Sequence, residues 1–398
     1  MNRSLASRMS RVKPSAIREL LQLGSEPGII SFGGGYPDPG LFPIAELDAI
    51  FHEVIASHGK QSLQYAASTG LPRLREQIAE RMSADGTPTD VENVLIIQGA
   101  QQGLDLVAKM LIDPGDLIVT DDPTFLGGLI AFNPCEPRYA AVPMDSDGMI
   151  VDALEEILRK ERCKFIYLIP DFQNPTGVSM HASRRKRIVE LANQYDTMIL
   201  EDSPYREVRY AGERQPTMKS FDTEGRVIHL GSFSKILAPA LRTGWVVADE
   251  EIIHQLGLLK VAADTQCSTL NMAAVSLFLD EFDVDEQIIS IREAYGRKKE
   301  LTLEVIRNNF PAEVSYTDPE GGMFTWLTFP DGFDTAKFML EEALPKAKVA
   351  YVPGATFFPT MERPNHARIS LSAQNDDAIR AGLGALGQLV SEALCPAC

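Results

Sequence analysis

A lysine with an unusual set of neighbours is the first candidate for chemistry in this sequence. Residues 231–235 read Gly-Ser-Phe-Ser-Lys directly after an apolar run, and Arg242 stands seven residues beyond Lys235. The hydroxyls of Ser232 and Ser234, together with an arginine, suit a bound phosphate beside an amine nucleophile. A lysine at the mouth of a cationic, partly dry pocket has a lowered pKa, which imine chemistry requires. The alternative is a solvated lysine in a surface loop.

Two other apolar runs are followed by residues that can bind an anion. The run ending at Ile97 leads into Ala100 and Gln101, where small residues and free N–H groups at the start of a helix favour negative charge. After the run at residues 165–169, Asn174 can donate a hydrogen bond to a bound oxyanion. The Asn-Pro-x-Gly pattern at this position is equally typical of a simple turn, so both interpretations stay open.

A carboxylate follows a further apolar run, because Asp202 and Tyr205 come after residues 198–200. Burying a carboxylate at a strand end is costly unless it meets a cation, and a pyridinium nitrogen is one such cation. A surface-facing aspartate is the alternative. In open parallel sheets, ligands bind beyond the carboxyl ends of the strands. If these runs are strands of one sheet, the residues that follow them form one site.

The hydrophobic pattern predicts the elements that position these residues. Short apolar runs alternate with helical stretches, at residues 94–97, 117–119, 165–169, 198–200 and 227–230. Near-continuous apolar strands separated by helices indicate a largely parallel sheet that is buried on both faces. With 398 residues, the chain is too long for a single typical core, which suggests two compact domains.

The region after Trp245 is predicted to be helical at first and then mixed. A long helix is expected at residues 283–308, followed by strands at 322–329 and 368–371 and by helices at 335–344 and 376–393. We therefore expect an α/β fold. A large domain holds a largely parallel, seven-stranded-type sheet flanked by helices, and a smaller α+β domain is built from both chain ends. The expected boundaries are 1–45 and 286–398 for the small domain and 46–285 for the large one.

Charge and composition exclude several classes of partner. The formal net charge of −17 repels phosphate backbones and anionic lipids, so we expect no nucleic-acid or membrane partner. No apolar run could span a bilayer, and the N-terminus lacks the apolar core of a secretory signal. These features and the five scattered cysteines indicate the cytoplasm. The C-x-x-C of Cys395 and Cys398 is expected to be an inert tail, and no metal site is predicted.

The segment around Lys235 resembles that of a known family. Residues 231–245, together with residues 173–177, are similar to the Schiff-base segment and the Asn-Pro-x-Gly segment of fold-type I pyridoxal 5′-phosphate (PLP) enzymes, the aspartate aminotransferase superfamily. The resemblance covers essentially the whole chain, from residues 15–20 to residues 368–371. It is strongest to the subgroup that contains 2-aminoadipate and kynurenine aminotransferases.

The resemblance implies roles for the residues around the cofactor ring. Lys235 forms the Schiff base with PLP and then moves a proton between the substrate Cα and the cofactor C4′. Asp202 pairs with the protonated pyridine nitrogen and keeps the cofactor an electron sink. Asn174 and Tyr205 donate hydrogen bonds to the phenolic oxygen. Phe125 stacks on the ring, at a position where many relatives carry tyrosine.

The resemblance also implies residues that hold the phosphate and the substrate. The phosphate contacts are Ala100, Gln101, Ser232, Ser234 and Arg242, with Tyr65 reaching the phosphate of a neighbouring subunit. A homodimer with shared active sites follows from the role of Tyr65. Arg368 binds the substrate α-carboxylate through the fork geometry of its guanidinium, with Asn174 and Gly34 assisting.

The sequence leaves the roles of two residues open. Asp171 precedes Asn174 where small or polar residues are common in relatives, and its direction is open. Arg18 lies on a predicted N-terminal helix, where an arginine of this subgroup can meet the distal carboxylate of an acidic substrate. It could equally form a surface pair with Glu19 or Glu26.

Reversible transfer of an amino group between an L-amino acid and a 2-oxo acid is the leading hypothesis for function. The family suggests 2-oxoglutarate and glutamate as one pair, with a ping-pong mechanism through a pyridoxamine form. PLP supports other reactions in the same site, so a lyase or a racemase is the alternative. Regulators that fuse this domain to a DNA-binding module are disfavoured, because the resemblance begins almost at residue 1 and the chain is acidic.

Overall fold

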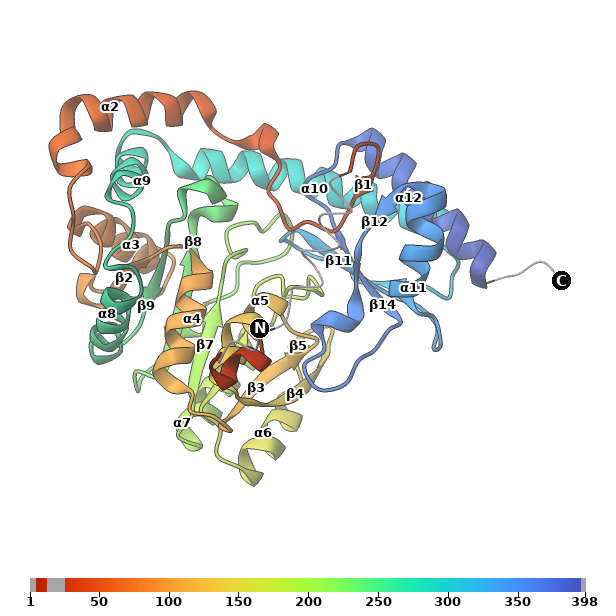
Figure 1. Ribbon diagram of the computed structural model, residues 1–398, viewed down its shortest axis with the longest axis horizontal. Helices are drawn as coiled ribbons and strands as arrows, with labels where there is room; N and C mark the ends of the chain where they lie inside the picture. Colours follow the sequence, from red (N-terminus) through yellow and green to blue (C-terminus); the bar gives the residue numbers. More distant parts are fainter. Residues whose placement is uncertain (1–4, 13–25, 395–398) are drawn as a thin grey trace.

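The structure is a computed structural model that describes residues 5–12 and 26–394, and a large sheet lies at its centre (Figure 1). The strands of this sheet lie in the order β2 (Val94–Ile97), β9 (Gly244–Val247), β8 (Val227–Ser232), β7 (Met198–Asp202), β6 (Phe165–Leu168), β3 (Leu117–Asp122), β4 (Arg138–Asp145) and β5 (Gly148–Met149). The two-residue β5 pairs with β4 at one edge, which makes the sheet eight-stranded instead of seven-stranded.

The strands that precede the candidate residues all point in one direction. β8, β7, β6, β3 and β4 pair in parallel with one another. β9 is antiparallel to both β8 and β2, so β2 runs in the same direction as β8. The carboxyl ends of the five predicted strands therefore meet at one edge of the sheet. The prediction of a largely parallel sheet is confirmed.

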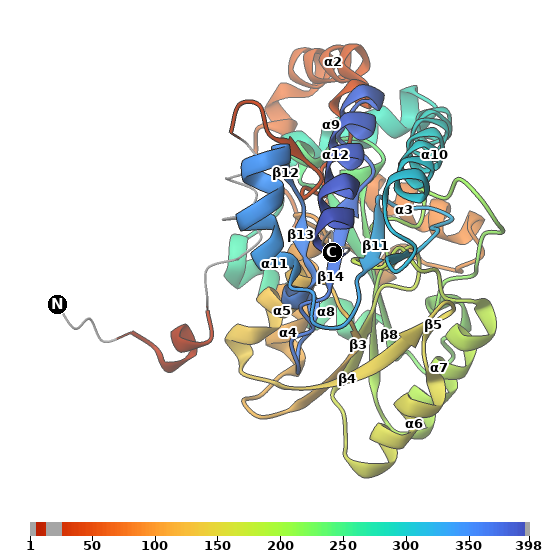
Figure 2. The ribbon, with the colours of Figure 1, turned by 90° about the vertical axis from the view of Figure 1, so that its right-hand side faces the viewer.

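Helices cover both faces of the large sheet. They are α2 (Ile44–Ser62), α3 (Pro72–Ala84), α4 (Ala100–Leu111), α5 (Leu126–Phe132), α6 (Val151–Lys160), α7 (Ala182–Gln194), α8 (Glu250–Asp264) and α9 (Thr269–Glu281). Successive side chains of a strand point to opposite faces. Along β6, Phe165 and Tyr167 join the core beneath α3, α4 and α9, whereas Ile166 and Leu168 join the core beneath α6 and α7. Figure 2 shows α6 and α7 side by side on their face.

A smaller domain is built from both chain ends, as expected. Its sheet has the order β10 (Ser315–Tyr316), β11 (Phe324–Thr328), β14 (His366–Ser370) and β13 (Val352–Pro353), and β1 (Ile30–Ser31) pairs in parallel with β12 (Val349–Ala350). Its helices are α10 (Val284–Asn309), α11 (Thr335–Phe338), the π-helical continuation η8 (Met339–Ala347) and α12 (Asp376–Leu394). Phe32 is buried in the core of this domain, together with residues of α10 and α12.

The long helix α10 connects the two domains. Its first half, including Ile288 and Tyr295, packs in the core of the large domain, and its second half, including Leu303 and Ile306, packs in the core of the small one. A boundary at residue 285 assigns this helix to the small domain, and the exact domain limits stay a prediction. Within residues 5–12 and 26–394, no helix combines the length and the apolar character needed to cross a membrane.

Short 3₁₀ helices join the longer elements. They are η1 (Ser7–Ser10), η2 (Pro39–Leu41), η3 (Val91–Asn93), η4 (Asn133–Cys135), η5 (Lys219–Phe221), η6 (Phe233–Lys235), η7 (Pro239–Leu241) and η9 (Gly354–Phe357). Of these, η6 matters most for function, because it places Lys235 directly after the carboxyl end of β8.

Candidate active site

Lys235 is the last residue of η6, and its amine faces a glycine-rich loop from the N-terminal part of the chain. Nζ donates a hydrogen bond to the carbonyl oxygen of Gly35 over 2.8 Å. Loss of solvent around the amine lowers the pKa of Lys235 to about 8, and the positive charges of Arg368 and Arg242 act in the same direction. A substantial fraction of the amine is therefore neutral close to physiological pH, as a nucleophile or base requires.

Three predicted site residues from different elements form one hydrogen-bonded chain. Asn174, which follows β6, donates from Nδ2 to the hydroxyl of Tyr205 over 3.1 Å. Arg368 of β14 donates from Nη1 to Asn174 Oδ1 over 2.8 Å and from Nη2 to the carbonyl of Gly33 over 2.7 Å. All three side chains are buried. The structure thus brings a residue of the small domain to the carboxyl edge of the large sheet.

Arg368 is held between aromatic rings and keeps donor capacity. Its guanidinium carbon lies 4.2 Å from the ring centroid of Phe324 and 5.2 Å from that of Phe357. Burial lowers the pKa of Arg368 to about 10. Within the part of the chain that the structure describes, Nε has no hydrogen-bond partner although it is buried. Such an orphaned donor is expensive unless a ligand accepts from it.

Asp202 ends β7 and is fully buried, with only one of its two oxygens bonded. The hydroxyl of Tyr167 donates to Oδ2 over 3.0 Å, whereas Oδ1 has no partner among the described residues. Burial raises the pKa of Asp202 to about 7. The preceding carboxylate, Glu201, differs because it accepts from the backbone N–H of Met218 at 2.8 Å and pairs with His229 at 2.9 Å. Counting contacts among the described residues, Asp202 is the one of these two neighbours with an oxygen left for a cation.

The start of α4 and the segment after β8 form an anion cradle. Ala100 is the first residue of α4, and Gly99 before it has a left-handed φ of 76°. A Cβ on Gly99 would lie 2.8 Å from Nη2 of Arg242, so glycine is needed for the guanidinium to approach. That Nη2 donates to the carbonyl of Gln98 over 2.8 Å. The free N–H groups of a helix start beside an arginine are a typical phosphate site.

The remaining cradle residues are Ser232 and Ser234, and they face each other. Ser232 Oγ donates to Ser234 Oγ over 3.0 Å and accepts from the backbone N–H of Ser234 over 3.1 Å. Gln101 differs, because its amide donates to the carbonyl of Gly127 over 2.8 Å and thereby connects α4 to α5.

The ring of Phe125 packs against a glycine, and Gly34 leaves room for a tyrosine ring. Phe125 is the N-cap of α5, and a Cβ on Gly127 would lie 2.4 Å from its ring. A Cβ on Gly34 would lie equally close to the ring of Tyr36. Tyr65 is exposed, as are Gln101 and Arg242, and 80% of its surface is accessible.

The sequence matches that of a large group of enzymes. The family described as Aminotransferase class I and II matches residues 35–386, which is most of the chain. This chain belongs to that aminotransferase family.

Curated relatives and solved structures agree with the family. The aminotransferase is 41% identical to aromatic-amino-acid aminotransferase 1 of Thermococcus litoralis, over 96% of this chain and 92% of the relative. It is 37% identical to 2-aminoadipate transaminase of Thermus thermophilus, over 95% and 94% of the two chains. The crystal structure of Pyrococcus horikoshii kynurenine aminotransferase, in complex with PMP, superposes with a TM-score of 0.94 at 38% identity, covering 98% of this chain and 97% of that one.

The aminotransferase is a PLP enzyme of fold type I, and its residues fit the cofactor. Asp202 keeps a buried oxygen for a ring nitrogen, and Lys235 offers an amine of lowered pKa. Gly99 and Arg242 frame a helix start that suits a phosphate. The three features are those that a pyridinium, an aldehyde and a phosphate require.

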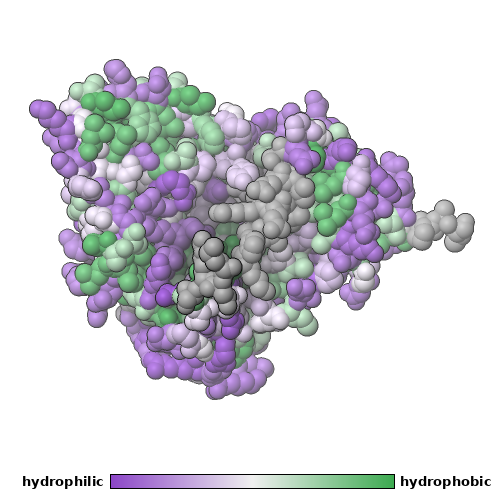
Figure 3. Space-filling model, viewed as in Figure 1, coloured by the Kyte–Doolittle hydropathy of each residue, from purple (hydrophilic) through white to green (hydrophobic). Residues whose placement is uncertain are grey.

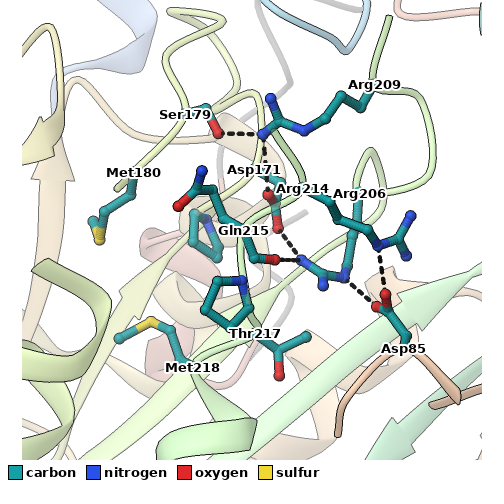
Figure 4. A network of polar contacts seen from close by, with 12 residues as sticks. Asp85, Asp171, Ser179, Met180, Arg206, Arg209, Arg214, Gln215, Thr217 and Met218 are labelled. Carbon is teal, nitrogen blue, oxygen red and sulfur yellow. Dashed lines mark hydrogen bonds and ion pairs between the residues drawn. The ribbon is translucent and has the colours of Figure 1, made fainter. Parts of the chain in front are cut away.

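Asp171 does not serve this site. Arg185 binds it through both terminal nitrogens, at 2.8 and 3.0 Å, and Arg206 donates to the same carboxylate over 3.1 Å. Figure 4 shows Asp171 between Arg206 and Arg209, with Asp85 on the far side of Arg206. These guanidinium groups hold the pKa of the buried Asp171 carboxyl far below its usual range, against the effect of burial. The open question about its direction is therefore answered: Asp171 belongs to an internal ion-pair network.

Sequence reasoning missed several residues of the aminotransferase site. The backbone carbonyls of Gly33 and Gly35 bind Arg368 and Lys235, and a sequence gives no signal for a carbonyl contact between distant segments. Tyr167 was included only in an apolar strand. A buried tyrosine hydroxyl needs a polar partner, so a tyrosine in this apolar strand could have indicated a buried polar contact.

Some predicted residues cannot be placed. Arg18, Cys395 and Cys398 lie outside the residues that the structure describes.

Proposed function

We propose that this aminotransferase moves an amino group between an L-amino acid and a 2-oxo acid, by a ping-pong mechanism with 2-oxoglutarate and glutamate as one pair. One observation carries the proposal. Arg368 reaches the carboxyl edge of the large sheet with a buried Nε that has no partner among the described residues, beside the same glycine loop that receives Lys235. A buried guanidinium close to a reactive amine suits a substrate that carries a carboxylate and an amino group on one carbon.

In the proposed mechanism, Arg368 binds the substrate α-carboxylate. Its guanidinium is already oriented by Asn174 and by the stacking of Phe324, so little conformational entropy is lost when the substrate arrives. Asn174 and Tyr205 are proposed to donate to the phenolic oxygen of the cofactor. Burial raises the pKa of Tyr205 to about 12, which keeps its hydroxyl protonated and able to donate.

Lys235 is the proposed base. When bound, PLP supplies the electron sink for the carbanion that forms at the substrate Cα. Nζ of Lys235 removes the proton from this Cα, and its pKa of about 8 suits a base that works close to neutral pH. Asp202 holds a negative charge opposite the ring nitrogen.

The names of relatives support the choice of substrates. One relative is named for 2-aminoadipate, which is glutamate lengthened by one methylene, and another for aromatic amino acids. A solved neighbour holds kynurenine. We propose that this chain accepts an acidic amino acid as one donor. The panel of amino acids given below identifies the side chain of the second.

We further propose a homodimer with shared active sites in the cytoplasm. Exposed apolar side chains occur on α2 and α8, among them Ile55, Leu258 and Val261, and Figure 3 shows green areas over these helices. Apolar groups gathered on a surface are typical of an interface. Tyr65, with 80% of its surface exposed, is proposed to meet another subunit. Cys135, Cys163 and Cys267 are free thiols, which suits a reducing compartment.

A half-reaction tests the proposed function. Holoenzyme incubated with one amino acid and no 2-oxo acid should lose the absorption of the lysine-bound cofactor. It should release one equivalent of 2-oxo acid per active site, and 2-oxoglutarate should restore the starting spectrum. Racemisation, decarboxylation or elimination without this conversion would instead favour the lyase or racemase alternative. Glutamate, 2-aminoadipate, leucine, phenylalanine and kynurenine form a suitable panel.

A further inference from the structure

Tyr167 is a buried residue whose hydroxyl contacts the carboxylate of Asp202. It stands in β6, where all other residues are apolar, and it pairs across the sheet with Leu200 of β7. Asp202 lies two residues beyond Leu200, so its side chain and that of Tyr167 share one face of the sheet. The distance from the hydroxyl to Oδ2 is 3.0 Å.

The phenol ring of Tyr167 is fixed by α5. The ring of Phe132 meets it edge-on, with centroids 5.1 Å apart. A Cβ on Gly128 would lie 2.7 Å from a ring carbon of Tyr167, so only glycine lets the ring lie against this helix. The same helix begins at its N-cap Phe125, which is proposed to stack on the cofactor. One short helix therefore supports both the ring-stacking residue and the partner of Asp202.

The hydrogen bond divides the two oxygens of Asp202 between protein and ligand. Oδ2 accepts from Tyr167, and Oδ1 is the buried oxygen without a partner among the residues described. Around this pair, His229 of β8 adds positive charge, while Tyr205 and Asp121 of β3 add negative charge when ionised. Burial and the nearby carboxylates raise the pKa of Tyr167 well above its usual value, so the hydroxyl stays a donor.

We infer that Tyr167 is a positioning residue for the cofactor ring: it orients the Asp202 carboxylate and stabilises its charged form, leaving Oδ1 for the ring nitrogen. This inference rests on the proposed role of Asp202. It differs from a packing role, because the hydroxyl and not the ring is required. The chemical reason is that a hydrogen bond to a carboxylate favours the ionised acid against the effect of burial.

The test replaces Tyr167 by phenylalanine, which keeps the ring against Phe132. Titration of apoenzyme with PLP, followed by tryptophan fluorescence, should give a dissociation constant about tenfold higher than wild type. The acid limb of kcat/KM should move to higher pH, because a carboxyl that loses its donor is protonated more easily. Tyr139→Phe is the matched control. Tyr139 lies in β4, which β3 separates from β6, and its hydroxyl donates to Asn133 over 2.7 Å, so its loss should leave cofactor affinity unchanged.

A double-mutant cycle separates this inference from the function on which it rests. Asp202→Asn should weaken PLP binding by itself, and Tyr167→Phe should then add less than about a threefold effect, because both changes act through one carboxylate. If Asp202→Asn leaves affinity unchanged, the proposed role of Asp202 is wrong. If Asp202→Asn weakens binding but Tyr167→Phe does not, only the inference is overturned. Equal losses in Tyr167→Phe and Tyr139→Phe also overturn it.

A second variant keeps the test decisive if Tyr167→Phe does not fold. Gly128→Ala retains the phenol but pushes its ring away from α5, since the new Cβ overlaps the ring. We expect a weaker affinity for PLP in the same direction as Tyr167→Phe and of smaller size. An affinity equal to that of wild type, in a folded Gly128→Ala protein, contradicts the inference.

Discussion

Asp171 and Asp202 are both fully buried aspartates at the carboxyl edge of the large sheet, yet their surroundings are opposite. Both oxygens of Asp171 are bonded by arginines, and those charges lower its pKa far below the usual range. Within the part of the chain that the structure describes, Asp202 has one neutral donor and one oxygen without a partner, and burial raises its pKa to about 7. The two carboxylates lie at the ends of neighbouring strands, so position in the fold does not explain the difference.

The comparison teaches how to separate a structural charge from a functional one. A fully paired charge holds segments together, here the loops that carry Asn174 and Tyr205. A charge with unsatisfied atoms is destabilising until a ligand arrives. Arg368 and Lys235 belong with Asp202, because one keeps a buried nitrogen without a partner among the described residues and the other has a lowered pKa. We therefore propose these three incompletely compensated groups as the functional ones.

The largest effect should come from Lys235, the lysine whose pKa is lowered. Lys235→Ala should lower kcat/KM for transamination by more than about a thousandfold, because the nucleophile and the base are lost together. Steady-state assays with glutamate would measure it. Lys299→Met is the matched control. Lys299 lies on α10, and its Nζ donates to Asp318 Oδ1 over 2.9 Å. The kcat/KM of this variant should stay within about twofold of wild type, because the partners of this buried amine, Glu300 and Asp318, are not among the residues proposed to contact the cofactor or substrate. Equal losses in both variants would break the comparison.

Asp171→Asn should affect stability first. Removing its charge leaves Arg185 and Arg206 buried and incompletely compensated, which costs about 3 to 5 kcal/mol of unfolding free energy. Urea unfolding of the apoenzyme would measure the loss. The affinity of the folded fraction for PLP should change much less than in Asp202→Asn. An unfolding midpoint equal to that of wild type would show that the arginine network is not structural.

Asp202→Asn should instead raise the free energy of unfolding of the apoenzyme, and this gain should depend strongly on pH. The folded pKa of about 7 lies above the unfolded value of 3.8, so the folded state binds more protons between these values, and wild-type stability falls as pH rises. Asparagine cannot ionise. The variant should therefore gain about 2 to 3 kcal/mol relative to wild type between about pH 5 and about pH 8. Urea titrations at the two pH values would measure this gain. A difference that does not depend on pH would mean that Asp202 is not held neutral by burial.

The sequence predicted the parallel strands because they depend on local signals, and the same signals gave most of the candidate site residues. Apolar runs at β2, β3, β6, β7 and β8 located the sheet, and the residues after four of them gave the candidates Ala100, Asn174, Asp202 and Lys235. β4 was missed because it lies near one edge of the sheet and mixes polar and apolar residues from Arg138 to Asp145. β9 was missed because it lies in the segment after Lys235 that was assigned to cofactor binding, and the sequence after Trp245 was expected to be helical.

Contacts between distant segments could not be predicted in the same way. The direction of Asp171 depends on Arg185 and Arg206, which are 14 and 35 residues away, and no spacing rule connects them. Tyr167 and Asp202 meet only because β6 and β7 pair in one register. A shift of one residue would turn Asp202 to the other face of the sheet. The pairing of charges, and with it the distinction between Asp171 and Asp202, depends on this register.

The smallest effect concerns Tyr65, which no described segment of its own chain covers. The contacts of Asp171 and Asp202 lie within one chain. Tyr65, in contrast, is 80% exposed and is proposed to act across a subunit interface. Mixing the Lys235→Ala protein with a Tyr65→Ala protein after reversible dissociation tests this. In a mixed dimer, one site combines the intact Lys235 of one subunit with the intact Tyr65 of the other.

Random mixing makes half of the dimers mixed, so about a quarter of the wild-type number of sites should be intact. Activity should rise above the average of the two parent proteins and reach about a quarter of wild type if each parent is inactive. Mixing Lys235→Ala with Asp202→Asn provides the control, because both residues serve the same site of one chain and no mixed dimer restores it. Activity equal to the parental average in both mixtures would place Tyr65 in the site of its own chain and remove the argument for shared sites.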